Sequence, residues 1–274
     1  MRNTFTLIIG LLLVGSAMSM AAEQSVPPTV QPLPAPDLEN PAMTYDGCLK
    51  LARETPERGF EFSGMWLGLG GGEPARHCQA VALIGLKEYG EAATRLEEMA
   101  EESRENTVVR AGILAQAGQA WLLEGELERA YATQTTALGL LPLIDRHRIA
   151  LLIDRAETLA AAQNYWEALD DLNDAIAADP DNADALAFRA SAYRYVEAPD
   201  VAMEDANRAL RADPANVSAL LERGILYQLK GDKNAARQDW LAAIQIAPDS
   251  AAADAARTNI EKLDVKVEAT PSAD

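Results

Sequence analysis

Asp179-Pro180-Asp181-Asn182 returns 34 residues later as Asp213-Pro214-Ala215-Asn216 and then, more loosely, as Ala247-Pro248-Asp249-Ser250. Proline cannot continue a helix, and the residue before it is displaced from the helical region, so each proline marks the end of a helix. A fixed period of this length is typical of similar helical units stacked side by side. Only 5% of the 274 residues are aromatic, and Ala, Leu and Glu are abundant, which favours helices over strands.

The same period runs back through the chain in a set of alanines, each in the second helix of its unit. They are Ala92, Ala130, Ala168, Ala202 and Ala236, at spacings of 38, 38, 34 and 34 residues. A small or apolar pair such as Ala243-Ile244 follows each alanine seven and eight residues later, and a helix brings these positions onto one face. Because four extra residues add about one helical turn, the longer spacings indicate longer units of the same fold.

These units resemble the tetratricopeptide repeat family, whose pattern is large-x2-Leu-Gly-x2-Tyr, then Ala-x3-aromatic, then Pro. The best match consists of Leu220, Arg223, Gly224, Tyr227, Ala236, Trp240 and Pro248. Three consecutive copies are in register, and the resemblance covers residues 73–250. It implies an all-α fold, a right-handed α-solenoid of about five stacked helix–turn–helix repeats with helical caps. Small residues, such as Gly224 against Ala236, would let paired helices approach closely.

The two ends of the chain have a different composition. Arg2 precedes an apolar run at 7–14, and Ser19-Met20-Ala21 offers small residues for cleavage, so a signal peptide and a periplasmic or secreted location are expected. An uncleaved inner-membrane anchor is the alternative, because residues 3–22 carry no charge. The expected segments are a signal peptide (1–21), a Pro-rich disordered linker (22–41), a degenerate helical cap (42–72), repeats at about 73–106, 111–144, 149–182, 183–216 and 217–250, a capping helix (251–264) and a disordered tail (265–274).

The charge of the chain is strongly negative. The sequence has 24 Lys and Arg against 42 Asp and Glu, and removal of residues 1–21 takes away one positive charge, which leaves 23 − 42 = −19. Such a surface repels phosphate groups and anionic lipids, which argues against nucleic acid and membrane surfaces as partners. No integral membrane domain is expected after removal of the signal.

A second periodic set departs from the family pattern. Arginines stand where the family has leucine, and an aspartate follows each of them sixteen residues later. The set is Arg155, Arg189, Arg223, Asp171, Asp205 and Asp239. The co-periodic acids favour a structural salt-bridge ladder between paired helices, whereas a binding stripe for an acidic ligand, the alternative, would not require them.

Cys48 and Cys78 are the only cysteines, and an even number in an oxidising compartment predicts a disulfide. A metal site formed with His77 would lack a fourth ligand. The second histidine, His147, lies in another unit, so the sequence nominates no catalytic, cofactor or metal site. The tryptophans are expected in the core and not in a ligand cage, but Trp166, which has the weakest counterpart in the other repeats, is left open.

The resemblance implies a non-enzymatic scaffold or adaptor of the cell envelope that binds a protein or peptide in the concave groove of the first helices. The expected groove residues are Gln119, Glu157, Ser191, Arg194, Tyr195, Leu221, Ile225 and Gln228. A clamp for a C-terminal carboxylate is not expected, since its lysine-type positions are held by Ala115, Ile153, Ala187 and Leu221. The alternative function is a hydrolase-type envelope enzyme, or an enzyme subunit, with a TPR-like body.

Overall fold

The computed structural model describes residues 32–142 and 145–264, and all the regular structure in these ranges is helical. The chain divides into two units between Pro34 and Ala35, and all the described helices lie in the second unit. The expected signal peptide, the first half of the Pro-rich linker (22–31) and the tail fall outside the described residues. The helices are α1 (Pro41–Glu54), α2 (Pro56–Gly68), α3 (Gly72–Gly85), α4 (Tyr89–Glu102), α5 (Thr107–Glu124), α6 (Leu127–Leu140), α7 (His147–Ala161), α8 (Tyr165–Ala178), α9 (Ala183–Tyr195), α10 (Pro199–Ala212), α11 (Val217–Leu229), α12 (Lys233–Ile246) and α13 (Ala251–Asp264).

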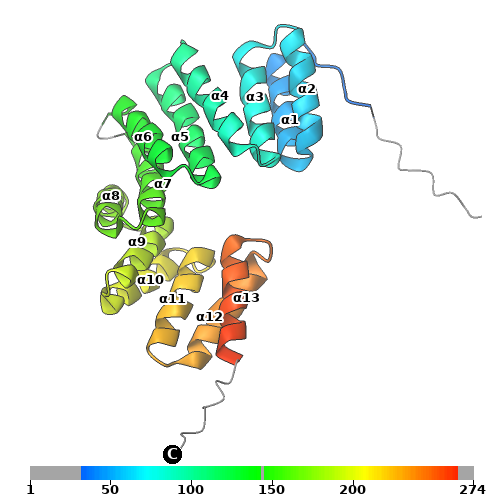
Figure 1. Ribbon diagram of the computed structural model, residues 1–274. Helices are drawn as coiled ribbons and strands as arrows, with labels where there is room; N and C mark the ends of the chain where they lie inside the picture. Colours follow the sequence, from blue (N-terminus) through cyan, green and yellow to red (C-terminus); the bar gives the residue numbers. More distant parts are fainter. Residues whose placement is uncertain (1–31, 143–144, 265–274) are drawn as a thin grey trace, which may run out of the picture. The chain divides into compact units, whose positions relative to one another are not determined.

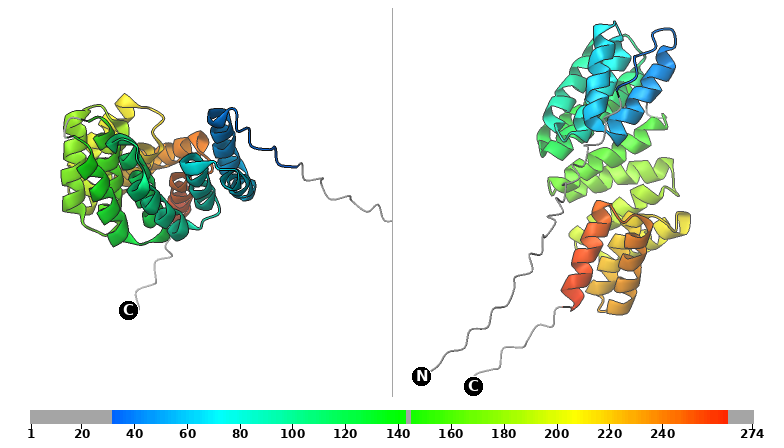
Figure 2. Two further views of the ribbon diagram at one scale, coloured as in Figure 1. Left: turned by 90° about the horizontal axis from the view of Figure 1, so that it is seen from above. Right: turned by 90° about the vertical axis from the view of Figure 1, so that its right-hand side faces the viewer.

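Each helix packs against the next one along the chain, as Figures 1 and 2 show. The closest pairs from α5 onward are α5 with α6, α7 with α8, α9 with α10, and α11 with α12. The first helices of neighbouring pairs also touch, α5 with α7, α7 with α9, and α9 with α11. The prediction of an all-α solenoid of helix–turn–helix units is therefore confirmed.

Proline and asparagine mark the boundary between consecutive units. Helices α8 and α10 end two residues before Pro180 and Pro214, respectively. Asn182 and Asn216 then cap α9 and α11, where their side chains accept a hydrogen bond from the backbone N–H of Ala185 (3.0 Å) and Ala219 (2.8 Å). An asparagine in this position satisfies an N–H group that the first turn of a helix leaves without a partner, so the repeated Asp-Pro-x-Asn sequence ends one helix and starts the next.

Small residues set the close approach within each pair. The five periodic alanines are all fully buried. A Cβ atom at Gly224 would lie 2.6 Å from Cδ1 of Trp240, so this glycine makes room for the indole of Trp240, not for Ala236 as the sequence suggested. Gly118 makes room in the same way for Gln134, whose Cγ would lie 2.6 Å from an added Cβ. In these two pairs, the large side chain on the second helix thus needs the glycine on the first helix.

The two ends of the stack are covered by other helices. At the first end, a disulfide joins the buried Cys48 of α1 to Cys78 of α3, as predicted. At the other end, α13 packs against α11 and α12 and buries Ala253 and Ala256 completely. Among the described residues, the helices are too short or too polar to cross a membrane.

Candidate partner-binding face

The ladder arginines are held by the aspartates of the following helix. Arg189 donates from Nε to Oδ2 of Asp205 (2.7 Å) and from Nη2 to Oδ1 (2.9 Å). The Arg155–Asp171 and Arg223–Asp239 pairs repeat this bidentate geometry at 2.7–2.8 Å. The aspartate hydrogen bonds are the main cause that raises the pKa of each arginine. The three guanidinium groups are therefore engaged by ion pairs between paired helices.

The remaining guanidinium nitrogen of each ladder arginine reaches the preceding unit. Nη1 of Arg189 donates to Oδ1 of Asn173 on α8 (2.8 Å), and Nη1 of Arg223 donates to Oδ1 of Asn207 on α10 (3.2 Å). Nη1 of Arg155 donates to Oγ1 of Thr135 on α6 (3.1 Å). Each arginine therefore ties its own pair of helices to the pair before it, a role that the sequence analysis missed.

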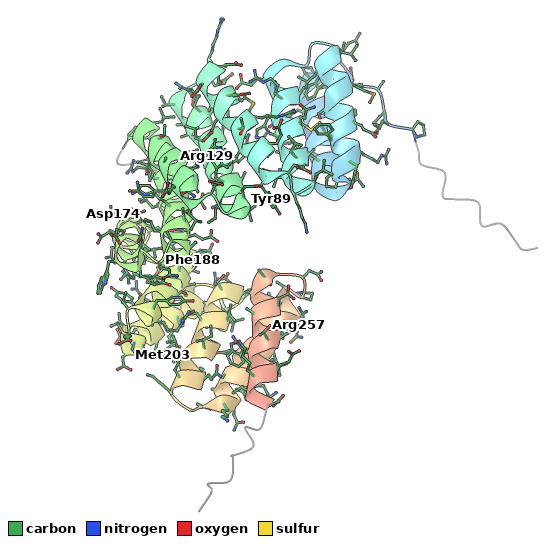
Figure 3. The ribbon with its side chains drawn as sticks, viewed as in Figure 1. Tyr89, Arg129, Asp174, Phe188, Met203 and Arg257 are labelled. Atoms are coloured by element: carbon green, nitrogen blue, oxygen red, sulfur yellow. A yellow bond between two sulfur atoms is a disulfide. The ribbon has the colours of Figure 1, made fainter. Side chains whose placement is uncertain are left out.

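An earlier unit uses a different device. Arg129 of α6, labelled in Figure 3, lies 3.3 Å from the ring centroid of the buried Trp121. Glu97 of α4 accepts hydrogen bonds from Nε1 of Trp121 (2.9 Å) and from Oγ1 of Thr133 (2.5 Å). It also pairs with Arg129 at 3.3 Å. Three helices are joined here around one carboxylate and one cation–π contact.

At the centre of the expected groove, Gln119 of α5 meets two acids of α7. The amide of Gln119 lies near both carboxyl groups and lowers the pKa of each. Burial raises the pKa of Asp154 to about 6, and the neighbouring charge of Glu157 adds to the shift, while the Gln119 amide opposes it. Burial raises the pKa of Glu157 as well. The structure thus brings Gln119 and Glu157 together, and it adds Asp154 to the face.

The next expected groove residues form an aromatic and cationic cluster. Arg194 forms an ion pair through Nε with the buried Glu222 of α11, and its Nη2 lies 3.5 Å from Oγ of Ser191. The guanidinium carbon of Arg194 lies 4.1 Å from the ring centroid of Tyr195. Tyr165 of α8 stacks on the ring of Tyr195, with centroids 4.6 Å apart and an interplanar angle of 2°. Sequence reasoning missed Glu222 and Tyr165, although Asp154 and Tyr89, respectively, hold the same places in other repeats.

The last expected groove residues are partly covered. Leu221 and Ile225 pack against a buried cluster that contains Trp240 and Ala256 and is flanked by Ile260 of α13. The capping helix therefore uses these two side chains as part of its own packing surface, and they are a poor contact site for a partner. Gln228, one turn further along α11, is partly exposed.

Trp166 is the exception among the tryptophans. Trp66, Trp121 and Trp240 are buried, as expected, but Trp166 is 67% exposed beside Tyr165 at the start of α8. Its counterparts in the other repeats, at the same offset from the periodic alanine, are Gly90, Glu128, Asp200 and Asn234. The sequence left the position of Trp166 open, and its exposure agrees with the polar or small residues that hold the same place in the other repeats.

A hydrogen-bonded relay joins the cap to the first helices of the stack. The Tyr45 hydroxyl lies 2.7 Å from Nδ1 of His77, and Nε2 of His77 lies 3.0 Å from Oε1 of Gln116. Since an amide oxygen only accepts, Nε2 carries the proton and Nδ1 accepts from Tyr45. Burial lowers the pKa of His77, in keeping with this neutral form. A pocket of about 390 Å³ opens beside the relay, between α1, α3 and α5.

In the described ranges, no group of three or more His, Cys, Asp and Glu side chains is arranged to hold a metal ion. The polar contacts of the face are hydrogen bonds and ion pairs between stacked helices, and what they leave available to a partner is an open pocket, two carboxylates and an aromatic cluster. This arrangement suits recognition of another molecule.

No family model and no curated protein matches the chain. Similar solved structures include MamA from Desulfovibrio magneticus RS-1, which is 22% identical over 74% of this chain and 98% of that chain, with a TM-score of 0.47. YrrB, a TPR protein with an unusual peptide-binding site, is 19% identical over 67% of this chain and 91% of that chain (TM-score 0.44). The second TPR domain of human RPAP3, solved with an HSP70 peptide, is 28% identical over 44% of this chain and 100% of that chain (TM-score 0.39).

At these TM-scores the likenesses decide nothing by themselves, and the helix packing and the repeat define the fold. Paired helices follow one another from α3 to α12, the periodic alanines lie at their crossings, and proline and asparagine separate the units. The chain has the fold and the repeat of a tetratricopeptide repeat protein.

Proposed function

We propose that this chain is a non-enzymatic interaction scaffold of the cell envelope, which binds a protein or peptide partner on the face formed by its first helices. The observation that carries the proposal is the cluster of Tyr165, Arg194 and Tyr195, which we call the aromatic cluster, with the exposed Trp166 next to Tyr165 at the start of α8. Trp166 is 67% and Tyr195 is 52% exposed. Tryptophan, tyrosine and arginine are the residues that most often dominate the binding energy of protein interfaces.

The aromatic cluster is already ordered before any partner binds. The ring of Tyr195 contacts both Tyr165 and Arg194, and Arg194 is itself fixed by Glu222. A side chain that is fixed in advance loses little conformational entropy on binding. Burial of the exposed part of an indole would contribute about 2–4 kcal/mol to an interface. Gln119, Glu157 and Ser191 are proposed to provide polar contacts beside the cluster.

The envelope location rests on two features. The first residues have the composition of an export signal, and the Cys48–Cys78 disulfide fits an oxidising compartment. Fractionation of cells that express the full chain tests this part of the proposal. Recovery with the cytosolic markers, with both cysteines free, would contradict it.

Crosslinking in cells tests the binding face. We expect the wild-type chain to trap a defined partner, and Trp166→Ala and Tyr195→Ala each to lower its recovery about tenfold or more, as truncation of an interface anchor does. Leu241→Ala is the matched control, because Leu241 is also 52% exposed but lies on α12. Equal recovery with all three variants, at unchanged helicity by circular dichroism, would contradict the assignment of the face.

A further inference from the structure

The pocket beside the His77 relay lies on α3 and α5, which belong to the same series of first helices as α9, the helix that carries Arg194 and Tyr195 of the aromatic cluster. His77 stands at the register of Ala115, Ile153, Ala187 and Leu221, with the same spacings of 38, 38, 34 and 34 residues. The pocket is formed by α1, α3 and α5 together with the segment between α4 and α5. A larger hollow of about 520 Å³ lies over α3 and α4, but its arginines, Arg76 and Arg95, are engaged by Glu102 and Glu91.

One wall of the pocket is apolar. Val109 and Ile113 of α5 line it, and Val109 is an exposed side chain. Gly112 lies between them, and a Cβ atom built there would have no neighbour within 4 Å. The missing side chain leaves open space above α5, into which another molecule's side chain can extend. An aliphatic chain of three or four carbons would be in contact with this wall.

The charged groups at the pocket are acidic. Its lining includes the carboxylates of Glu73 and Glu105, while the ionisable groups on its floor are Tyr45 and His77. His77 donates from Nε2 and accepts at Nδ1, which is the hydrogen-bonding pattern of a neutral imidazole. Glu73 accepts one hydrogen bond, from Oγ of Ser103 at 2.7 Å. The lining therefore carries two negative charges and no positive one, next to an apolar wall.

We propose that this pocket is the anchor site for a basic side chain, arginine or lysine, of the peptide or protein partner. The aliphatic stem would lie along Val109, Gly112 and Ile113, and the cationic head would face Glu73 and Glu105. Both basic side chains combine an apolar stem with a charged end, which is the combination that the lining offers. The inference rests on the proposed function and names the chemistry that the binding face selects.

Short peptides test the charge requirement directly on the full chain. The probes are acetyl-Gly-Ser-Gly-X-Gly-Ser-Gly amides in which X is arginine, lysine, leucine or citrulline, the neutral isostere of arginine. We expect the arginine and lysine peptides to shift the NMR signals of Gly112 and the Gln116 side chain, with Kd on the order of 1 mM for so short a probe. The citrulline peptide should bind at least about fivefold more weakly than the arginine peptide. Added salt should weaken the binding of the arginine and lysine peptides.

Two substitutions test the location. Glu105→Gln should weaken the arginine peptide about fivefold, as loss of one partly screened ion pair does. Gly112→Leu fills the open space and should abolish binding, whereas Gly139→Leu, at an exposed glycine of α6 that also has no neighbour within 4 Å, should have no effect. Equal binding of the arginine and citrulline peptides, preference for leucine, no binding of any peptide, or full binding to Gly112→Leu would each overturn the inference.

The crosslinking experiment separates this inference from the proposed function. If Gly112→Leu and Glu105→Gln leave the recovery of the partner unchanged while Trp166→Ala lowers it, the pocket is not an anchor site, although the binding face stands. If all of these variants recover the partner equally well, the proposed function itself fails. Loss of recovery with both Gly112→Leu and Trp166→Ala supports both statements.

Discussion

At the scale of single residues, Asp154 is the side chain whose charge conflicts most with its surroundings. Burial raises its pKa from 3.8 to about 6, so the folded chain holds the proton more tightly than the unfolded chain does. Between about pH 4 and pH 6 the folded state therefore binds more protons, and its stability falls as the pH rises through this window. Above about pH 6 the whole cost of the buried charge is present.

We accordingly predict that Asp154→Asn stabilises the protein at pH 7 by about 1–3 kcal/mol, because the amide removes the buried charge and can still accept a hydrogen bond. At pH 3.5 the substitution should have little effect. Urea unfolding of both proteins at the two pH values measures the difference. A variant that is less stable than wild type at pH 7 would show that the ionised Asp154 is favourable in the fold.

The residue contacts that could be predicted are those that recur with the repeat. Arg155, Arg189 and Arg223 revealed their aspartates because both sets keep the same spacing. Arg194 has no such partner series, so its ion pair with Glu222, 28 residues away, could not be foreseen. For this reason Arg194→Ala is a poor probe of binding, since it would leave the buried Glu222 without its cation and destabilise the fold.

At the scale of the helices, the packing of a helix pair determines which of its glycines can be replaced by a larger residue. We predict that Gly224→Ala destabilises the chain by about 1–3 kcal/mol, because the new methyl group would overlap the indole of Trp240. Nε1 of Trp240 donates to the carbonyl of Leu221 (3.1 Å), which restricts the movement of the ring. Gly47→Ala should instead stabilise α1 by about 0.5–1 kcal/mol, since a Cβ at this position has no neighbour within 4 Å.

The two variants carry the same substitution in the middle of a helix, so helix propensity alone predicts the same sign for both. Thermal and urea unfolding distinguish the two effects. Stabilisation by Gly224→Ala would mean that the α11–α12 pair separates easily and that close packing at Trp240 contributes little.

The helix boundaries around Pro180 and Pro214 could be predicted, because proline and asparagine act locally on the backbone. Pro180 and Pro214 follow the ends of α8 and α10, and Asn182 and Asn216 cap the next helices. The burial of Leu221 and Ile225 could not be derived in this way, although α13 itself was expected. Whether a capping helix covers the first or the second helix of the last pair depends on the angle at which it packs, which the sequence pattern does not contain.

At the scale of the whole molecule, contacts between distant parts of the sequence are few, because each unit packs against its neighbours. The stability of such a stack is a sum of local terms, so a change at one end should act mainly on that end. The Cys48–Cys78 disulfide is a covalent bond between neighbouring helices at one end of the stack, and it joins α1 to α3 across 30 residues. By constraining the unfolded chain, a loop of this length contributes about 3–4 kcal/mol in the chain-entropy model.

We predict that the double substitution Cys48→Ala and Cys78→Ala lowers the free energy of opening of α1–α3 by about 2–4 kcal/mol and leaves α9–α12 nearly unchanged. Amide hydrogen exchange, analysed helix by helix, measures both regions in one experiment. Reduction of the wild-type protein should reproduce the effect, and the same reductant should not affect the double variant, because it no longer has a disulfide. An equal loss of protection in α1–α3 and α9–α12 would mean that the thirteen described helices unfold as one cooperative unit, in contradiction to the nearest-neighbour packing from which the prediction is derived.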